Sequence, residues 1–222
     1  MRPVKRRIRH HVEYLASVSA TVQILNTIFS STLGRMKYQQ SLAEAREEAS
    51  SLGKRLYGTL LKSDLRSRVA LSCFAIAQQH HSAIIVLLSQ PQPLQSSAFS
   101  LLRPLAEATF RGFWIDRCAS DEKIENILSG DKKQIDTATI IRELLVAVGQ
   151  SDKHSSFYKR VWPSLSAYTH SYEESLHPWL SGRDIEPSFA EDHLLSLLTR
   201  ASLMAKLIEA GVRSLIVDST QK

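Results

Sequence analysis

Apolar residues recur three and four positions apart through most of the chain, and few glycines or prolines interrupt them. The 222 residues include eight glycines and seven prolines, whereas a fold built from short strands needs turn residues at frequent intervals. No stretch sustains the alternation of apolar and polar residues that is typical of a half-buried strand. The sequence therefore predicts an all-α fold, an antiparallel helical bundle of about six or seven helices joined by short connections.

The helix boundaries follow from capping residues and helix breakers. We expect Ser63 to cap the second helix, and Ser120 to cap a short helix with acids in its first turn. Pro104 should bend or restart the third helix, Gly149 should end the fifth, and Pro178 should close the sixth. The predicted helices cover residues 37–62, 64–89, 96–119, 120–128, 133–148, 155–176 and 188–217.

The first 35 residues differ in composition from the remainder. Residues 1–9 hold five of the 28 basic residues and no acid, which leaves 23 basic and 22 acidic residues elsewhere. The net charge of +6 therefore comes mostly from this arm, and the body lacks a broad basic footprint for a phosphate backbone. Residues 14–34 carry no formal charge, but nine of them are Ser, Thr, Gln or Asn, so we favour an amphipathic helix over a membrane segment.

Two parts are expected from this difference: a basic arm with an uncharged helix at 1–35, and a helical bundle domain at 36–222. Three interpretations of the first part stay open, namely a tail, a targeting segment, and a region upstream of an internal start at Met36.

Cysteine usage and the lack of cofactor motifs narrow the chemistry. Cys73 and Cys118 stand alone in apolar helical patterns, which argues against a disulfide framework and favours a reducing cytoplasm. Glu174 and His177 have the E-x-x-H spacing of di-iron bundles, but no second such pair exists in the sequence. No glycine-rich phosphate loop, G-x-S-x-G elbow or C-x-x-C motif is present. We therefore expect neither a metal nor a cofactor.

A polar stripe crosses one of the most apolar segments of the chain, residues 97–119. Arg103, Glu107 and Arg111 follow each other at intervals of four, so they lie on one side of a helix, with Glu107 within reach of both arginines. One interpretation is an internal ion network that fixes helix register, and the other is a polar pocket open to a ligand.

Residues 157–180 concentrate two tryptophans, three tyrosines and two histidines. The pocket interpretation requires that this segment approach the polar stripe and contribute Tyr168 and His170, since histidine titrates near neutrality and acts as a general acid or base. On this hypothesis the candidate catalytic residues are Arg103, Glu107 and His170. The candidate binding residues are Arg111, Trp114, Tyr168 and Tyr172.

Three short motifs carry a family resemblance: RPLAEA at 103–108, RGFW at 111–114 and YTH at 168–170. Together they resemble a family of uncharacterised bacterial helical proteins over about residues 40–215. More remotely, the chain is similar to the HEPN superfamily, small helical domains of toxin–antitoxin and phage-defence systems. That resemblance implies a HEPN-like bundle, dimerisation and, in some members, metal-independent RNA cleavage by an arginine and a histidine at R-x(4–6)-H spacing. Here the arginine preceding His170 is Arg160, ten positions earlier, so Arg103 would have to supply the guanidinium from another helix.

Two functional interpretations remain open. The first is a cytoplasmic, homo-oligomeric protein of a stress or defence type that cleaves RNA or handles nucleotides through the Arg103, Glu107 and His170 pocket. The second is a non-catalytic interaction module, antitoxin-like or oligomerising, whose helix faces bind a protein partner. Membrane association through residues 1–34 is a weaker third alternative.

Overall fold

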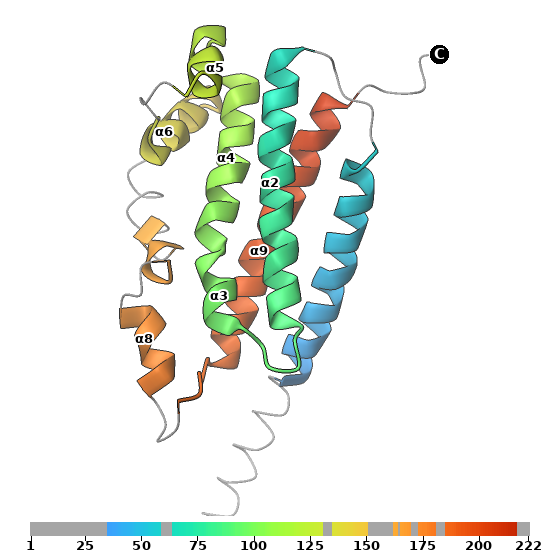
Figure 1. The fold of residues 1–222 in the computed structure, drawn as a ribbon, viewed down its shortest axis with the longest axis vertical. Coiled ribbons are helices and arrows are strands. Elements are labelled where there is room, and N and C mark those ends of the chain that lie inside the picture. The colour runs from blue at the N-terminus through green and yellow to red at the C-terminus, as the bar shows by residue number, and fades with distance from the viewer. Residues whose placement is uncertain are drawn as a thin grey trace, which may run out of the picture. The chain divides into compact units, whose positions relative to one another are not determined.

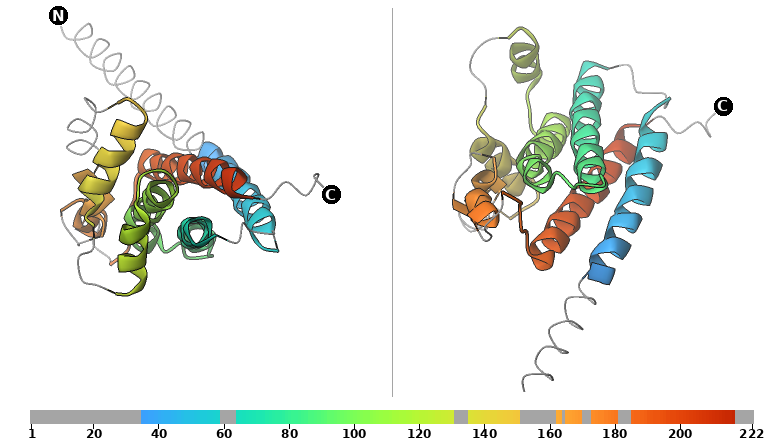
Figure 2. Two further views of the ribbon diagram at one scale, coloured as in Figure 1. Left: turned by 90° about the horizontal axis from the view of Figure 1, so that it is seen from above. Right: turned by 60° about the horizontal axis from the view of Figure 1, so that its bottom comes forward.

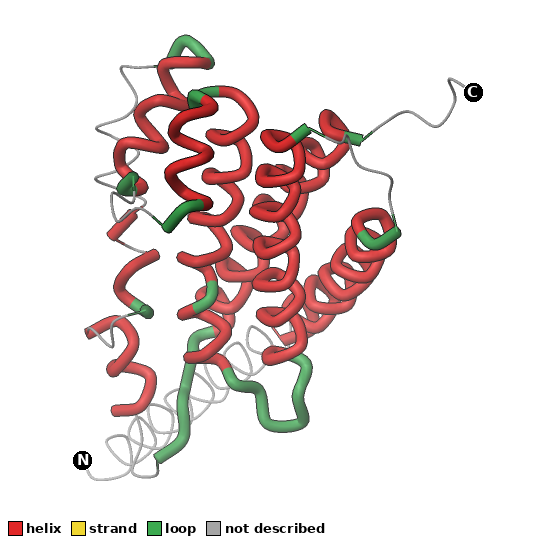
Figure 3. Tube along the Cα trace, turned by 45° about the horizontal axis from the view of Figure 1, so that its top comes forward, coloured by secondary structure: helices red, strands yellow, loops and turns green. Residues whose placement is uncertain are grey.

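The chain divides into two compact units, Met1–Ser41 and Leu42–Lys222. The computed structural model describes residues 35–58, 64–130, 135–150, 162–163, 165–169, 173–180 and 185–216. Helices joined by loops and turns make up these residues (Figure 3), so the all-α prediction is confirmed. The predicted basic arm and uncharged segment lie outside the described residues.

Three long helices form the centre of the second unit. They are α2 (Leu65–Leu88), α4 (Leu102–Arg117) and α9 (Glu191–Leu215), which lie side by side in Figure 1 and in both views of Figure 2. α4 runs antiparallel to α2, because a loop and the short helix α3 (Gln95–Ser100) reverse the chain between them. These helices supply most of the apolar core.

Phe74 of α2 holds the three helices together. Its ring is fully buried, and it fits between Gly112 of α4 and Gly211 of α9. A Cβ atom at Gly112 would lie 2.6 Å from the ring, and one at Gly211 would lie 2.3 Å from it. The two glycines are therefore required for close packing, since a methyl group at either position would overlap the aromatic carbons.

The helix over residues 35–56 contributes its part from Leu42 onward to the second unit. Arg46 Nε donates to Ser89 Oγ at 2.7 Å, and Arg55 forms an ion pair with Glu209 at 3.3 Å. This helix therefore contacts both α2 and α9. Gly58, with a φ of 84°, follows its end, in the left-handed conformation that commonly terminates helices.

Arg66 of α2 joins the end of α4 to the start of α5 (Asp121–Leu128). Its Nη1 donates to the carbonyls of Ile115 at 2.7 Å and Ala119 at 2.6 Å, and its Nη2 contacts the Asp121 carboxylate at 2.5 Å. The carbonyls at a helix C-terminus lack partners within the helix and carry partial negative charge, so a guanidinium is a well-matched cap.

The predicted restart near Pro104 is confirmed. The chain turns at Leu101, between α3 and α4, which places Pro104 in the first turn of α4. An amide N–H has no helical acceptor there, so proline costs little at this position.

Three predicted features were wrong. The cap of α2 is Asp64 rather than Ser63, since the Asp64 carboxylate accepts from the backbone N–H of Ser67 at 2.9 Å. Pro178 does not close a helix but lies inside α8 (Glu173–Leu180). The continuous helix predicted over 155–176 is interrupted by a turn at 168–169.

Two other predicted helix ends are confirmed. Ser120 caps α5, because its Oγ accepts from the backbone N–H of Lys123 at 3.3 Å. Gly149, with a φ of 70°, follows α6 (Thr137–Ala147) and ends it as expected.

Candidate functional site

The polar stripe on α4 begins with an ion pair. Arg103 Nε lies 2.9 Å from Glu107 Oε1, and the two side chains are 26% and 34% exposed. The guanidinium also donates from Nη1 to the hydroxyl of Ser166 at 3.1 Å. Arg103 is therefore bound on two sides, and part of its side chain remains accessible to solvent.

The contact with Ser166 brings a second segment of the chain to α4. The Arg103 guanidinium lies over the ring of Trp162, 5.3 Å from its centroid, which is within the range of a cation–π interaction. Ser166 Oγ in turn donates to the Trp162 carbonyl at 3.0 Å. Ser166, which lies in the aromatic segment over 157–180, is thus a hydrogen-bond partner of the polar stripe, whereas the approach of His170 to this stripe stays a prediction.

Two of the predicted site residues, His170 and Tyr172, lie outside the described residues. Thr169, immediately before His170, is described, and its hydroxyl lies 3.4 Å from the Ser100 carbonyl. The chain thus contacts the end of α3 directly before His170. The catalytic role of His170 stays a prediction.

Arg111, the third member of the predicted stripe, lies near Cys73 of α2. Burial raises the pKa of the Cys73 thiol, and the positive charge of Arg111 partly opposes that rise. In the part of the chain that the structure describes, the ion pair of Glu107 is formed with Arg103. The two arginines therefore have different neighbours, Glu107 for Arg103 and Cys73 for Arg111, although both lie on one side of α4.

Trp114 is completely buried, and its indole N–H forms a hydrogen bond. The indole N–H donates to Glu143 Oε2 at 2.6 Å, and the ammonium of Lys123 lies 3.3 Å from Glu143 Oε1. Burial raises the pKa of Glu143, but the hydrogen bonds from Trp114 and Lys123 outweigh it and hold that pKa below its ordinary value. This geometry gives Trp114 a structural role between α4 and α6, and its role in binding stays a prediction.

Tyr168 belongs to an aromatic stack that borders a cavity. The ring centroids of Tyr168 and Phe99 lie 4.3 Å apart, and those of Phe99 and Phe189 lie 5.0 Å apart. The cavity beside the stack encloses about 200 Å³, and α9 contributes His193 and Arg200 to its wall. Sequence reasoning selected Tyr168 but missed the α9 residues, because their side chains meet the stack only in the folded chain.

A wider groove lies where the loop after α2 meets the loop before α9. It encloses about 600 Å³, and its walls include Pro91, Pro93, Trp179, Ile185 and Pro187. The Trp179 indole N–H donates to Ser96 Oγ at 3.0 Å across this region. The two loops lie near the same end of the helices in Figure 3.

The described residues form no recognisable metal site. No group of three or more His, Cys, Asp or Glu side chains is arranged there to hold an ion. His177, part of the E-x-x-H pair in the sequence, has an exposed side chain on α8.

In the part of the chain that the structure describes, these residues define a class of protein: an all-α bundle with an arginine–glutamate ion pair on the central helix α4, a cavity beside the Tyr168 stack and a groove between two loops. The model of a family of unknown function, DUF6988, matches residues 74–215, which is more than half of the chain. The chain belongs to this family, and the expectation of an uncharacterised helical family is confirmed. No curated protein and no solved structure matches the chain.

Proposed function

We propose that this protein is a non-catalytic helical interaction module that self-associates through the outer face of α2. The observation that carries the proposal is a row of exposed and half-buried positions along α2 and two residues past its end, spaced alternately four and three residues apart. We call this row the α2 seam, and it consists of Leu65, Val69, Ser72, Ile76, Gln79, Ala83, Val86 and Gln90.

The seam lies opposite the buried side of α2. Leu65, Ile76 and Val86 are 46%, 50% and 57% exposed, whereas Phe74 and Ile84 are completely buried. Figure 2 shows one flank of α2 uncovered, while α4, α9 and the helix over 35–56 surround the rest of it. Alternating spacings of four and three are the pattern by which two helices pack with side chains interlocked.

The absence of charge along the seam distinguishes it from an ordinary solvated helix face. A surface helix usually carries charged residues on its outer side, but the seam holds none over its eight positions. Small residues at Ser72 and Ala83 allow a second helix to approach closely. Exposed apolar patches bordered by polar residues are typical of protein interfaces.

Charge placement favours an antiparallel second copy as the occupant. Arg68 is exposed at the N-terminal end of α2, whereas the last turn of this helix has no basic residue. A parallel pair would bring the arginines of both copies together, which is unfavourable. An antiparallel pair places Arg68 beside the partner's α2 C-terminus, where the helix dipole attracts a cation.

Self-association is tested by light scattering coupled to size-exclusion chromatography. Wild-type protein should have twice the chain mass of 25.0 kDa. Ile76→Glu places two buried charges in a symmetric dimer, one from each copy, and should weaken association at least about hundredfold. The matched control is Val146→Glu, since Val146 of α6 is 58% exposed and lies outside the seam.

A wild-type protein that is monomeric at about 100 μM would refute the proposal, because stable dimers form well below that concentration. Equal masses for the Ile76 and Val146 variants would also refute it.

Among the described helices, α2 is long and apolar enough to cross a membrane, a property that core helices of soluble proteins share. Flotation of the protein with lipid vesicles, abolished by Ile76→Glu, would identify a membrane as the occupant instead.

We keep RNA cleavage or nucleotide handling as a second candidate function. The observation that favours it is the Arg103–Ser166 hydrogen bond, which joins the segment that precedes His170 in the sequence to a partly exposed arginine. A guanidinium binds phosphate well, and a histidine can exchange protons at neutral pH. The cytoplasmic location rests on the two solitary cysteines, and the defence role rests on the resemblance to HEPN domains.

Separate Arg103→Ala and His170→Ala variants test this second candidate. Each should remain folded by circular dichroism and lose cleavage of a labelled single-stranded RNA, while Arg213→Ala should retain it. Arg213 is a suitable control because it is 70% exposed on α9 and pairs with Glu209. Loss of folding in either variant would assign the substituted residue a structural role. Cleavage equal to wild type would assign it no role in cleavage.

A further inference from the structure

The cavity beside the Tyr168 stack has one apolar side and one polar side. Its apolar side is formed by the rings of Phe99 and Tyr168 together with Leu165. Its polar side comes from one face of α9, where Ser196 and Arg200 follow His193 at intervals of three and four residues. Residues at these intervals lie one above the other on a helix, so their side chains reach the same space.

The size of the cavity limits what it can hold. It encloses about 200 Å³, and a cavity of about 150 Å³ in another protein accommodates benzene. One six-membered ring with a single small substituent therefore fills it, whereas most of a nucleotide would lie outside it.

The charge of the lining limits the substituent. None of the described residues that line the cavity is acidic, and these residues include Arg200 and His193. A guanidinium binds a carboxylate through two parallel hydrogen bonds, and the Ser196 hydroxyl can donate a third. Both α9 groups are exposed at the rim, so a charged substituent would keep part of its hydration while the ring is buried.

We propose that this cavity is a binding site for a small aromatic monocarboxylate, with the ring against Phe99 and Tyr168 and the carboxylate at Arg200 and Ser196. Phe99 packs against both Tyr168 and Phe189, whose ring centroids lie 6.5 Å from each other, so the three rings form one cluster, which preorganises the apolar wall. The site is separate from the α2 seam, so it does not depend on self-association.

Benzoate is the probe, and benzamide is its neutral counterpart of nearly the same shape. Binding is measured by saturation-transfer NMR titration of the full chain. We expect saturable benzoate binding, and at least tenfold weaker binding of benzamide. Arg200→Gln should weaken benzoate binding at least tenfold, whereas Arg213→Gln, which changes another arginine of α9, should leave it unchanged.

A variant that fills the cavity keeps the test decisive. Ser196→Phe should abolish benzoate binding without unfolding the protein, because Ser196 is only partly buried. The Ile76→Glu variant should bind benzoate like the wild type, which separates this site from self-association. The proposal is overturned if benzoate shows no saturation up to about 10 mM, if benzamide binds equally well, or if Ser196→Phe retains binding.

Discussion

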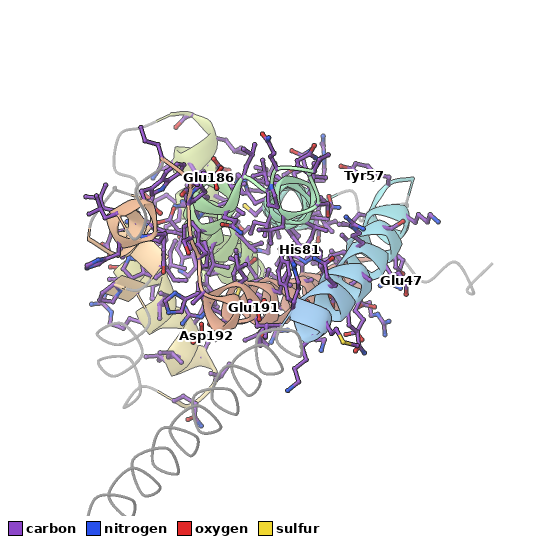
Figure 4. The ribbon with its side chains drawn as sticks, turned by 90° about the horizontal axis from the view of Figure 1, so that it is seen from below. Glu47, Tyr57, His81, Glu186, Glu191 and Asp192 are labelled. Carbon is purple, nitrogen blue, oxygen red and sulfur yellow. The ribbon has the colours of Figure 1, made fainter. Side chains whose placement is uncertain are left out.

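His81 makes the stability of the second unit depend on pH. Its side chain is completely buried in α2, and neither ring nitrogen has a hydrogen-bond partner among the described residues. Figure 4 shows it among the helices, whereas Glu47 and Tyr57 lie at the periphery. Burial lowers the pKa of His81 from 6.5 to about 4, because a protonated imidazole would be a charge without a partner in an apolar interior.

The sign and size of the effect follow from proton linkage. Between pH 6.5 and 4 the unfolded chain binds a proton at His81 and the folded chain does not, so acidification favours unfolding. The full difference is about 3 kcal/mol, and about 2 kcal/mol of it is lost between pH 7 and pH 5. The stability contributed by the lowered pKa values of Asp136 and Glu143 is lost only at lower pH.

Replacement of His81 by leucine should remove this dependence. Urea unfolding at pH 7 and pH 5 should show a drop for the wild type that exceeds the drop for His81→Leu by about 2 kcal/mol. At pH 7 the variant should be more stable by about 1 kcal/mol or more, since two buried nitrogens without partners are removed. His193→Asn, at an exposed position on α9, should keep the wild-type pH dependence. Equal pH dependence in wild type and His81→Leu would refute the reasoning, as would a large loss of stability at pH 7.

Three further predictions concern packing and hydrogen bonds. Gly211→Ala should lower the free energy of unfolding by about 1–3 kcal/mol, although alanine has the better helix propensity, because its Cβ would overlap the ring of Phe74. Thermal unfolding measures this loss, and a second substitution, Phe74→Leu, should partly restore the stability of the Gly211→Ala variant. Arg66→Met should cost about 2 kcal/mol in urea unfolding through loss of its carbonyl contacts, whereas Arg68→Met at an exposed neighbouring position should cost almost nothing. Glu143→Leu should strand the buried indole N–H of Trp114 and lower the melting temperature by several degrees, with Glu143→Gln closer to the wild type.

Most of the fold could be predicted because its signals are local. Helical periodicity, the Ser120 cap, the Gly149 stop and the restart near Pro104 each depend on residues within one or two turns. Local signals also misled at Pro178, because α8 continues through this proline to Leu180.

The candidate site divides in the same way. The Arg103–Glu107 pair was predictable, because side chains four apart on a helix are neighbours. The choice of Ser166 as the second partner of Arg103, and the pairing of Trp114 with Glu143, depend on how separate helices pack. Sequence spacing carries no information about such contacts.

The sequence by itself determined the class of fold and the polar stripe of α4, since both arise from the spacing of residues along single helices. Only the tertiary structure decided which side of α2 is buried, that Gly112 and Gly211 enclose Phe74, and that α9 completes the cavity beside Tyr168. The physical reason is that burial and cavity shape are properties of several packed helices at once, and each helix alone is compatible with many partners.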